Sequence, residues 1–166
     1  MMIMTSVGIS LITLAVVSLS CHAVNPKSLN VKYHVSTDFQ TWFQALINCR
    51  SAGMELASII TEKEEKDLET FLQQHQYTRG YWLSGTNLGN GVFYWASTGS
   101  LVNYTKWLID QPDNQQTGDS YNVGEHCIQF GLYNDSRKLN NGWNDMSCSA
   151  KLLYICEEPD NCNEIK

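Results

Sequence analysis

The sequence predicts an α+β fold, with two helices in the first half of the chain and short strands in the second half. Two capping-box motifs, Thr37 to Gln40 and Thr61 to Glu64, each stand before apolar residues at helical spacing. From Tyr81 onward the chain consists of short β-rich pieces separated by Gly and Asn. The change from the first pattern to the second predicts helices and strands in one domain.

A strand and a helix are expected at the start of the domain. Residues 31–35 alternate apolar and polar side chains, which is typical of a strand. The helix is expected to have Thr37 as its N-cap, with Gln40 completing the capping box, and to end at Gly53. Its inward face is predicted to hold Trp42, Leu46 and Cys49.

A second helix is expected after a short extended segment at 54–59. Thr61 and Glu64 form its capping box. We interpret the charged run at 62–69 as the solvated face of this helix. Its inward face is predicted to hold Leu68, Phe71 and Leu72.

The rest of the chain is predicted to form a sheet and one long loop region. Strands are expected at 81–85 and 92–95, joined by a turn at 87–91. Between residues 104 and 142 no strand longer than three residues is expected, so a bound cation and a disulfide would have to hold this segment in place. The apolar run at 151–156 is predicted to be a central strand.

Five side chains in and beside the long segment offer oxygen ligands of the kind that calcium prefers. Three of them are carboxylates, which would offset one divalent charge and leave about one negative charge over. No cluster of thiolates and histidines of the kind that zinc prefers accompanies them. The motifs at 111–114 and 143–145 are each, taken alone, also typical of a turn. Their combination with Glu125 and two flanking cysteines favours a calcium site. The five residues are Gln111, Asp113, Glu125, Asn144 and Asp145.

The beginning of the chain resembles a secretory signal peptide. An apolar run at 7–19 is followed by small residues ending at Ala23, and it is too short and too rich in hydroxyls for a membrane anchor. We therefore expect a signal peptide at 1–23, a mature domain at 24–166 and an extracellular, secreted protein. Two glycosylation motifs, at Asn103 and Asn134, agree with passage through the secretory route.

The net charge of −6 is carried wholly by the mature domain. Nucleic acids and anionic membranes both require a basic surface, so neither is expected as a partner. The sequence also has no Gly-rich phosphate loop, no His-Glu-x-x-His pair and no Gly-x-Ser-x-Gly nucleophile motif.

Five cysteines remain after the predicted cleavage, in a chain expected to reach an oxidising compartment. Four of them allow three pairings, and the sequence alone does not choose among these. Cys162 is left over: it forms an interchain bond in a homodimer, stays a free thiol, or pairs with Cys21 if cleavage falls after Ser20. The four are Cys49, Cys127, Cys148 and Cys156.

Taken together, these residues resemble a C-type lectin domain over about 33–157. The resemblance rests on the two capped helices, Trp82 to Gly85, Gln111 to Asp113, Trp143 to Asp145 and the four cysteines. It implies the C-type lectin-like fold: two helices flanking antiparallel sheets, with a long loop region stabilised by calcium. It also implies the disulfides Cys49–Cys156 and Cys127–Cys148.

The resemblance further implies a sugar site at the five oxygen ligands. In this family two neighbouring sugar hydroxyls complete the calcium shell and bond to the same side chains. Gln111-Pro-Asp113, with an implied cis bond before Pro112, resembles the galactose-binding type rather than the mannose-binding type. Tyr121 is either a platform on which the sugar stacks or an ordinary loop aromatic.

Two neighbouring positions were also considered. Asn87 stands where many relatives have an acidic residue for an auxiliary calcium, so that second site is in doubt. His126 either tunes the site or is a solvent-facing strand residue.

Three classes of function remain open at this stage. The favoured one is a calcium-dependent lectin for galactose or N-acetylgalactosamine, whose partners would be glycans on microbial or cell surfaces. The second is a protein-binding member of the same fold without sugar activity. The third, a glycosidase with Asp113 and Glu125 as acid and base, is disfavoured because both carboxylates are better explained as calcium ligands. We therefore expect no enzymatic activity.

Overall fold

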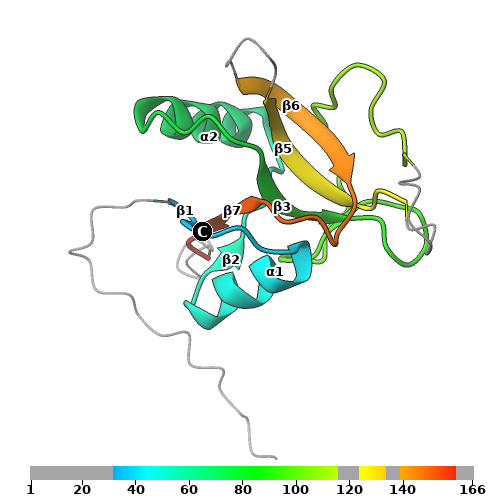
Figure 1. Cartoon of the computed structure of the whole chain (residues 1–166), viewed down its shortest axis with the longest axis horizontal. Coiled ribbons are helices and arrows are strands. Elements are labelled where there is room, and N and C mark those ends of the chain that lie inside the picture. Colours follow the sequence, from blue (N-terminus) through cyan, green and yellow to red (C-terminus); the bar gives the residue numbers. More distant parts are fainter. Residues whose placement is uncertain (1–31, 116–123, 134–138, 160–166) are drawn as a thin grey trace, which may run out of the picture.

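The structure is a computed structural model that describes residues 32–115, 124–133 and 139–159 of the 166-residue chain (Figure 1). The predicted signal peptide, Tyr121, Asn134 and Cys162 lie outside the described residues. Two helices are present, α1 (Trp42–Ser51) and α2 (Glu62–Gln74). The strands are β1 (Tyr33–Val35), β2 (Glu55–Leu56), β3 (Tyr81–Thr86), β4 (Tyr94–Trp95), β5 (Cys127–Tyr133), β6 (Leu139–Met146) and β7 (Leu153–Glu157).

The strands form one sheet in the order β1-β7-β3-β5-β6, with β2 also paired to β7 and β4 to β3. The last strand lies between β1 and β3, as its apolar sequence predicted. Every strand pair is antiparallel except β3 and β7, which run parallel, with Tyr81 opposite Leu153. The sheet is therefore mixed rather than purely antiparallel.

Helix α1 begins later than the sequence predicted. Thr41 is its N-cap and accepts a hydrogen bond from the backbone N–H of Gln44, so the expected cap at Thr37 is wrong. The reason lies in the preceding segment, whose backbone N–H groups at Ser36 and Gln40 donate to carbonyls of the β7 region. Those groups are used in pairing with a distant strand and are not free to start a helix.

Helix α2 follows its local signals closely. Thr61 and Glu64 form the expected capping box. Leu68 and Leu72 are buried, and Phe71 packs against the same core, as predicted. One residue of the charged run departs from the prediction, because Glu65 is only 1% exposed. Its spacing of three and seven residues from Leu68 and Leu72 places it on the buried face of the helix.

The expectation that residues 104–142 hold no strand longer than three residues is wrong, because β5 and the start of β6 lie in this range. Cross-strand pairing forms a long antiparallel hairpin from a sequence rich in Gly and Asn. Gly131 has a φ of 74° at a shift of register between Phe130 and Leu132, a bulge that glycine accommodates without strain. Nonlocal hydrogen bonds therefore outweigh the weak strand preference of this segment.

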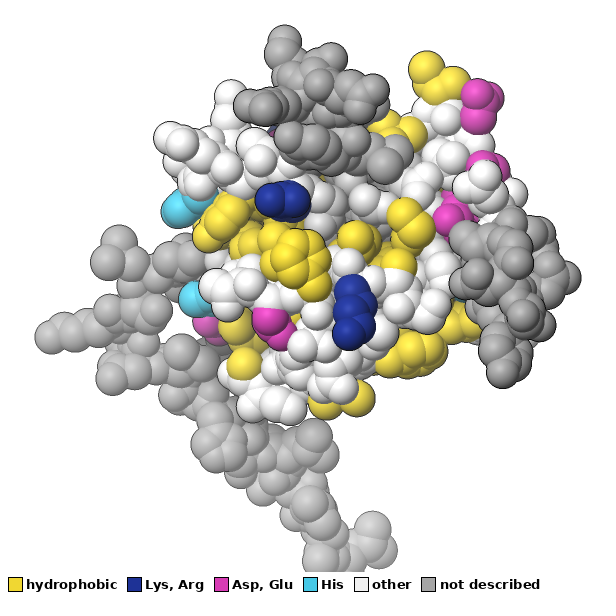
Figure 2. Space-filling model, viewed as in Figure 1, with side chains coloured by type: hydrophobic (Ala, Val, Ile, Leu, Met, Phe, Trp, Pro, Cys, Tyr) yellow, Lys and Arg dark blue, Asp and Glu magenta, His cyan; other side chains and the backbone are white. Residues whose placement is uncertain are grey.

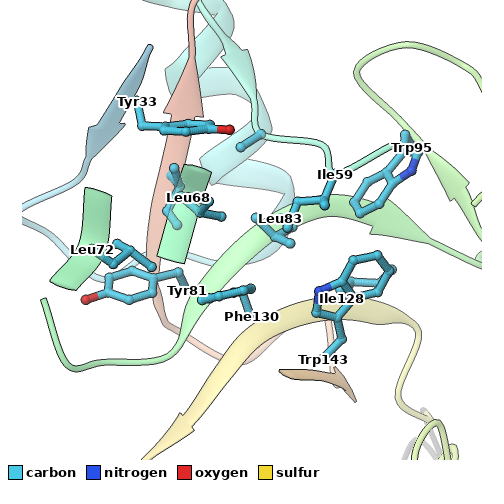
Figure 3. Close-up of a cluster of buried hydrophobic side chains, with 12 residues drawn as sticks. Tyr33, Ile59, Leu68, Leu72, Tyr81, Leu83, Trp95, Ile128, Phe130 and Trp143 are labelled. Carbon is cyan, nitrogen blue, oxygen red and sulfur yellow. The ribbon is translucent and has the colours of Figure 1, made fainter. Parts of the chain in front are cut away.

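The two faces of the inner strands bury two different clusters. Along β3, Tyr81 and Leu83 point into a cluster with α2, whereas Trp82 points into a cluster with α1. Residues of β7 alternate in the same way, as the period of two in a strand requires. Figure 1 shows the two helices on either side of these strands, and Figure 3 shows the α2 cluster running from Tyr33 to Trp143.

Two disulfides join the elements with the pairing that the resemblance implied. Cys49 of α1 is bonded to Cys156 of β7, and Cys127 of β5 is bonded to Cys148, just after β6. Their sequence separations of 107 and 21 residues correspond to about 5 and about 3 kcal/mol of loop-closure entropy. Within the described part of the chain, neither helix has the length and apolarity needed to cross a bilayer.

Candidate cation-binding site

Three carboxylates from distant parts of the chain meet at one end of the β5–β6 hairpin. Asp113, Glu125 and Asp145 each place one oxygen within 4.8 Å of the others. Asp113 lies in the loop before β5, Glu125 just before β5, and Asp145 in β6. Figure 2 shows acidic side chains on the surface at the upper right, whereas Glu125 and Asp145 of this cluster are buried. The structure thus brings together three of the five predicted ligands.

The hairpin register sets the positions of two of these groups. In the antiparallel pair of β5 and β6, Cys127 lies opposite Met146, and Ile128 lies opposite Asp145. One residue before β5, the N–H of His126 still donates to the carbonyl of Met146 at 3.2 Å. Glu125 therefore enters the site beside the end of β6, and the Cys127–Cys148 disulfide closes the same end of the hairpin.

Asp145 also fastens the loop that carries Asp113. Its two carboxylate oxygens accept backbone N–H groups, one from Asp113 at 3.1 Å and one from Asn114 at 2.8 Å. Asp145 is fully buried, so these hydrogen bonds satisfy a carboxylate that water does not reach. A single side chain thus fixes the loop and faces the other two carboxylates.

The Asn114 side chain lies directly against Gly124. A Cβ at residue 124 would overlap the side-chain amide of Asn114, so a larger residue there would require that amide to move. The approach brings the loop ending at Gln115 and the entry to β5 together. The contact between the Asn114 side chain and Gly124 therefore lies directly beside Glu125 in the chain.

The remaining predicted ligands are amides. Gln111 is half-buried, and its Oε1 is buried without a hydrogen-bond partner. Asn144 is buried and donates from Nδ2 to the carbonyl of Asp145. The bond before Pro112 is cis, as the resemblance implied. A buried amide oxygen without a partner, two residues before Asp113 in the chain, is a donor that a hard cation could use together with the three carboxylates, because calcium takes carboxylate and amide oxygens.

Burial and like charges together raise the pKa of one member of this cluster. Burial, followed by the charges of Asp145 and Asp113, raises the pKa of Glu125 to about 7. None of the ion pairs found between described residues includes any of the three carboxylates. A divalent cation would relieve the repulsion that raises this pKa.

His126 is half-buried and lies one residue before β5. Its Nδ1 lies 2.8 Å from Oδ1 of Asn87. The N–H of Asn87 in turn donates to the carbonyl of His126 at 3.0 Å. The side chain of Asn87, the position that corresponds to an auxiliary calcium ligand in many relatives, is thus hydrogen-bonded to His126.

Asn103 is exposed, and its glycosylation stays a prediction.

Two residues next to the site, Glu65 and Lys106, were not predicted from the sequence. Glu65 and Lys106 contact the region around Trp143, but neither belongs to a recognisable motif. For Glu65, helical spacing with Leu68 was the available signal.

Comparison with known proteins finds one family. A family model described as Lectin C-type domain matches residues 39–158. Salivary C-type lectin 2 of Aedes albopictus is 29% identical over 131 residues, which covers 76% of this chain and 82% of that protein. C-type lectin 16 of Aedes aegypti is 31% identical over 122 residues, which covers 70% of this chain and 75% of that protein.

A solved structure shows the same fold. The human scavenger receptor C-type lectin carbohydrate-recognition domain superposes with a TM-score of 0.63, covering 81% of this chain and 98% of that chain. The two sequences are 24% identical, so the comparison concerns the fold alone.

Proposed function

Because this chain belongs to the C-type lectin domain family, we propose that it binds glycans through a calcium ion. Lectins of this family bind ligands and do not catalyse reactions, so no catalytic role is assigned to Asp113 or Glu125. The ion would be held by Gln111, Asp113, Glu125, Asn144 and Asp145.

The observation that supports this proposal most strongly is the convergence of Asp113, Glu125 and Asp145 within 4.8 Å. Three carboxylates at this separation repel one another, and the raised pKa of Glu125 reflects that repulsion together with burial. A calcium ion would supply the missing positive charge and open coordination positions for sugar hydroxyls. The partnerless Oε1 of Gln111 supports the same assignment.

The order of amide and carboxylate in the loop supports a galactose-type preference. Gln111 provides an amide that donates to a sugar hydroxyl, and Asp113 provides a carboxylate that accepts from one. Each hydroxyl can then donate to a carboxylate and accept from an amide, and the hydrogen bond to the carboxylate is charge-assisted. Exchanging the two side chains would move donor and acceptor to opposite sides and favour mannose.

We also propose where the protein acts and what it binds there. We infer a secreted domain at 24–166 after a signal peptide at 1–23, and a relative of this chain is named for saliva. Galactose or N-acetylgalactosamine glycans on microbial or cell surfaces would be the partners, with Tyr121 as a candidate stacking residue. Glycosylation at Asn103 and Asn134 and a homodimer through Cys162 complete the proposal.

Retention on immobilised galactose tests this function directly. Wild-type protein should be retained with calcium and eluted by EDTA, and free galactose should elute it in preference to mannose. Asp113→Ala should abolish retention. Asp110→Asn is the matched control, because Asp110 is an exposed carboxylate in the same loop outside the cluster, and asparagine tolerates its φ of 64°.

The outcomes separate the two remaining functions. Retention of Asp113→Ala equal to that of wild type would show that the site is assigned wrongly. Wild-type protein that binds calcium but no sugar would favour the protein-binding alternative.

A further inference from the structure

Behind the candidate cation site, helix α2 buries the carboxylate of Glu65. Its side chain is only 1% exposed, and its Oε2 accepts the indole N–H of Trp143 at 3.0 Å. A buried carboxylate is costly unless it is paired and hydrogen-bonded. The position of Glu65 therefore has to be explained by its partners.

One partner, Trp143, directly precedes two of the proposed calcium ligands in β6. Its ring is fully buried and packs edge-on against Trp95, Tyr104 and Trp107, with centroids 5.5, 5.9 and 5.8 Å away. Figure 3 shows Trp143 and Trp95 together at one end of the core. Because Trp143 is fixed at both its ring and its backbone, its orientation sets the direction in which Asn144 and Asp145 leave it.

The other partner, Lys106, lies at the base of the loop that carries Gln111 and Asp113. Its Nζ is 3.7 Å from Oε1 of Glu65 and also pairs with Glu69. Its backbone carbonyl accepts the N–H of Trp143 at 2.8 Å, and the N–H of Leu108 donates to the carbonyl of Trp143 at 2.9 Å. Lys106 is thus bound to α2 by its side chain and to β6 by its backbone.

These contacts join the two halves of the candidate site to one helix. The half that carries Gln111 and Asp113 is attached through Lys106, and the half that carries Asn144 and Asp145 is attached through Trp143. Both attachments reach Glu65: Trp143 donates a hydrogen bond to its Oε2, and the amine of Lys106, which is hydrogen-bonded to Glu69, forms a longer ion pair with its Oε1. The ion pairs elsewhere on α2, such as Lys63 with Asp67 at 2.7 Å, are exposed and reach no other element.

We propose that Glu65 and Lys106 are positioning residues that hold the two halves of the cation site in register. The inference rests on the proposed calcium site and extends it to residues that touch neither ion nor sugar. Glu65 orients Trp143 and hence the β6 ligands, while Lys106 neutralises Glu65 and anchors the loop.

Because Glu65 and Lys106 carry opposite charges, single and double substitutions of this pair should have different effects. Lys106→Met keeps most of the aliphatic stem but leaves a buried carboxylate without its cation, which is strongly unfavourable. Glu65→Gln removes the charge but keeps an acceptor for Trp143. In the double variant the fully buried carboxylate has lost its charge, and only Glu69, which is partly exposed, is left without its partner. The double variant should therefore bind calcium better than Lys106→Met alone.

Calcium affinity of the full chain, measured by titration calorimetry well below the unfolding temperature, tests the pair. Lys106→Met should weaken binding about tenfold, and Lys106→Met with Glu65→Gln should recover to within about threefold of wild type. Lys63→Met is the matched control on α2 and should stay within about twofold. A purely structural role would lower the unfolding temperature and leave affinity at this lower temperature unchanged.

Two results would overturn the inference while the proposed function stands: wild-type affinity in Lys106→Met, or a double variant as weak as Lys106→Met. If wild-type protein itself binds no calcium, the proposed function fails and this inference fails with it. Should Lys106→Met not fold, Glu65→Leu decides instead. That variant removes both the charge and the acceptor for Trp143, so wild-type affinity in it would contradict the proposal.

Discussion

Two buried glutamates, Glu65 and Glu125, both have a raised pKa, but the charges around them differ in sign. Burial is the main cause that raises the pKa of each to about 7. Around Glu65 the charge of Lys106 and the indole N–H of Trp143 oppose this effect. Around Glu125 the charges of Asp145 and Asp113 add to it. The first carboxylate has its cation within the chain, whereas the second lacks one.

The comparison shows that a raised pKa alone does not distinguish a structural carboxylate from a binding one. What distinguishes them is the sign of the charges nearby. The cation of the pair shows the same rule. Partial burial lowers the pKa of the Lys106 amine, but pairing with Glu69 and Glu65 outweighs burial, so the net shift of this pKa is upward. The Glu125 cluster contains no such partner among the described residues, which is why we expect it to take a cation from solution.

The strongest test of this contrast is Asp145→Asn. It removes one charge from the Glu125 cluster and weakens the acceptors for the N–H groups of Asp113 and Asn114. We expect calcium affinity, measured by calorimetry, to fall by about 100-fold or more, because a ligand and the loop attachment are lost together. Affinity within about threefold of wild type would contradict the assignment of Asp145 as a ligand.

The pH dependence of calcium binding should expose the raised pKa of Glu125. In the ion-free protein Glu125 takes up a proton as pH falls through about 7, and calcium requires the ionised form. Affinity should therefore fall about tenfold per pH unit below about 7, with release from galactose resin on mild acidification. Retention that persists at about pH 4 would be incompatible with carboxylate ligands.

Exchanging the amide and carboxylate of the loop tests specificity at constant charge. Gln111→Glu with Asp113→Asn keeps the net charge of the cluster, so calcium affinity should change by less than about threefold. The sugar preference should shift by about tenfold toward mannose, because donor and acceptor exchange sides. Competitive elution with galactose and mannose measures this shift, and an unchanged preference would refute the donor–acceptor explanation.

The smallest expected effect is on the stability of the calcium-free protein. Both glutamates have a folded-state pKa raised above the ordinary value of 4.5, so their stabilising contribution is complete below about pH 4.5 and is lost as pH rises through about 7. The unfolding temperature should therefore fall by a few °C as pH rises from about 5 to about 8 in EDTA.

Calcium and one substitution separate the two contributions. Glu65→Gln should remove one part of this pH dependence, and calcium should cancel the part from Glu125 by holding it ionised. An unfolding temperature in EDTA that rises between about pH 5 and about pH 8 would contradict both assignments.

Local signals in the sequence were sufficient for α2 but not for the start of α1. The Thr61 and Glu64 capping box is complete within four residues, and no other element competes for its backbone groups. At Thr37 the same type of motif fails, because Ser36 and Gln40 are hydrogen-bonded to the β7 region more than a hundred residues away. A distant partner of this kind cannot be read from local spacing.

The site shows the same division. All five predicted ligands come from motifs, but the approach of Asp113, Glu125 and Asp145 depends on the β5–β6 hairpin, which the sequence did not predict. Gln129 is buried in that hairpin with its amide donating to the carbonyl of Gly131, a role that its residue type does not suggest. The buried position of Glu65 was obscured by the charged residues on both sides of it.

The pairing of β1 with β7 determines where this domain can be attached to a surface or fused to another protein. Tyr33 lies opposite Glu157, so the first and last strands leave the fold at neighbouring points (Figure 1). In the same view the end of β6, which carries Asp145 of the carboxylate cluster, lies on the other side of the molecule from β1. A tether, fusion partner or sensor surface attached near either of these points would therefore leave the opposite end of the molecule open to ligands.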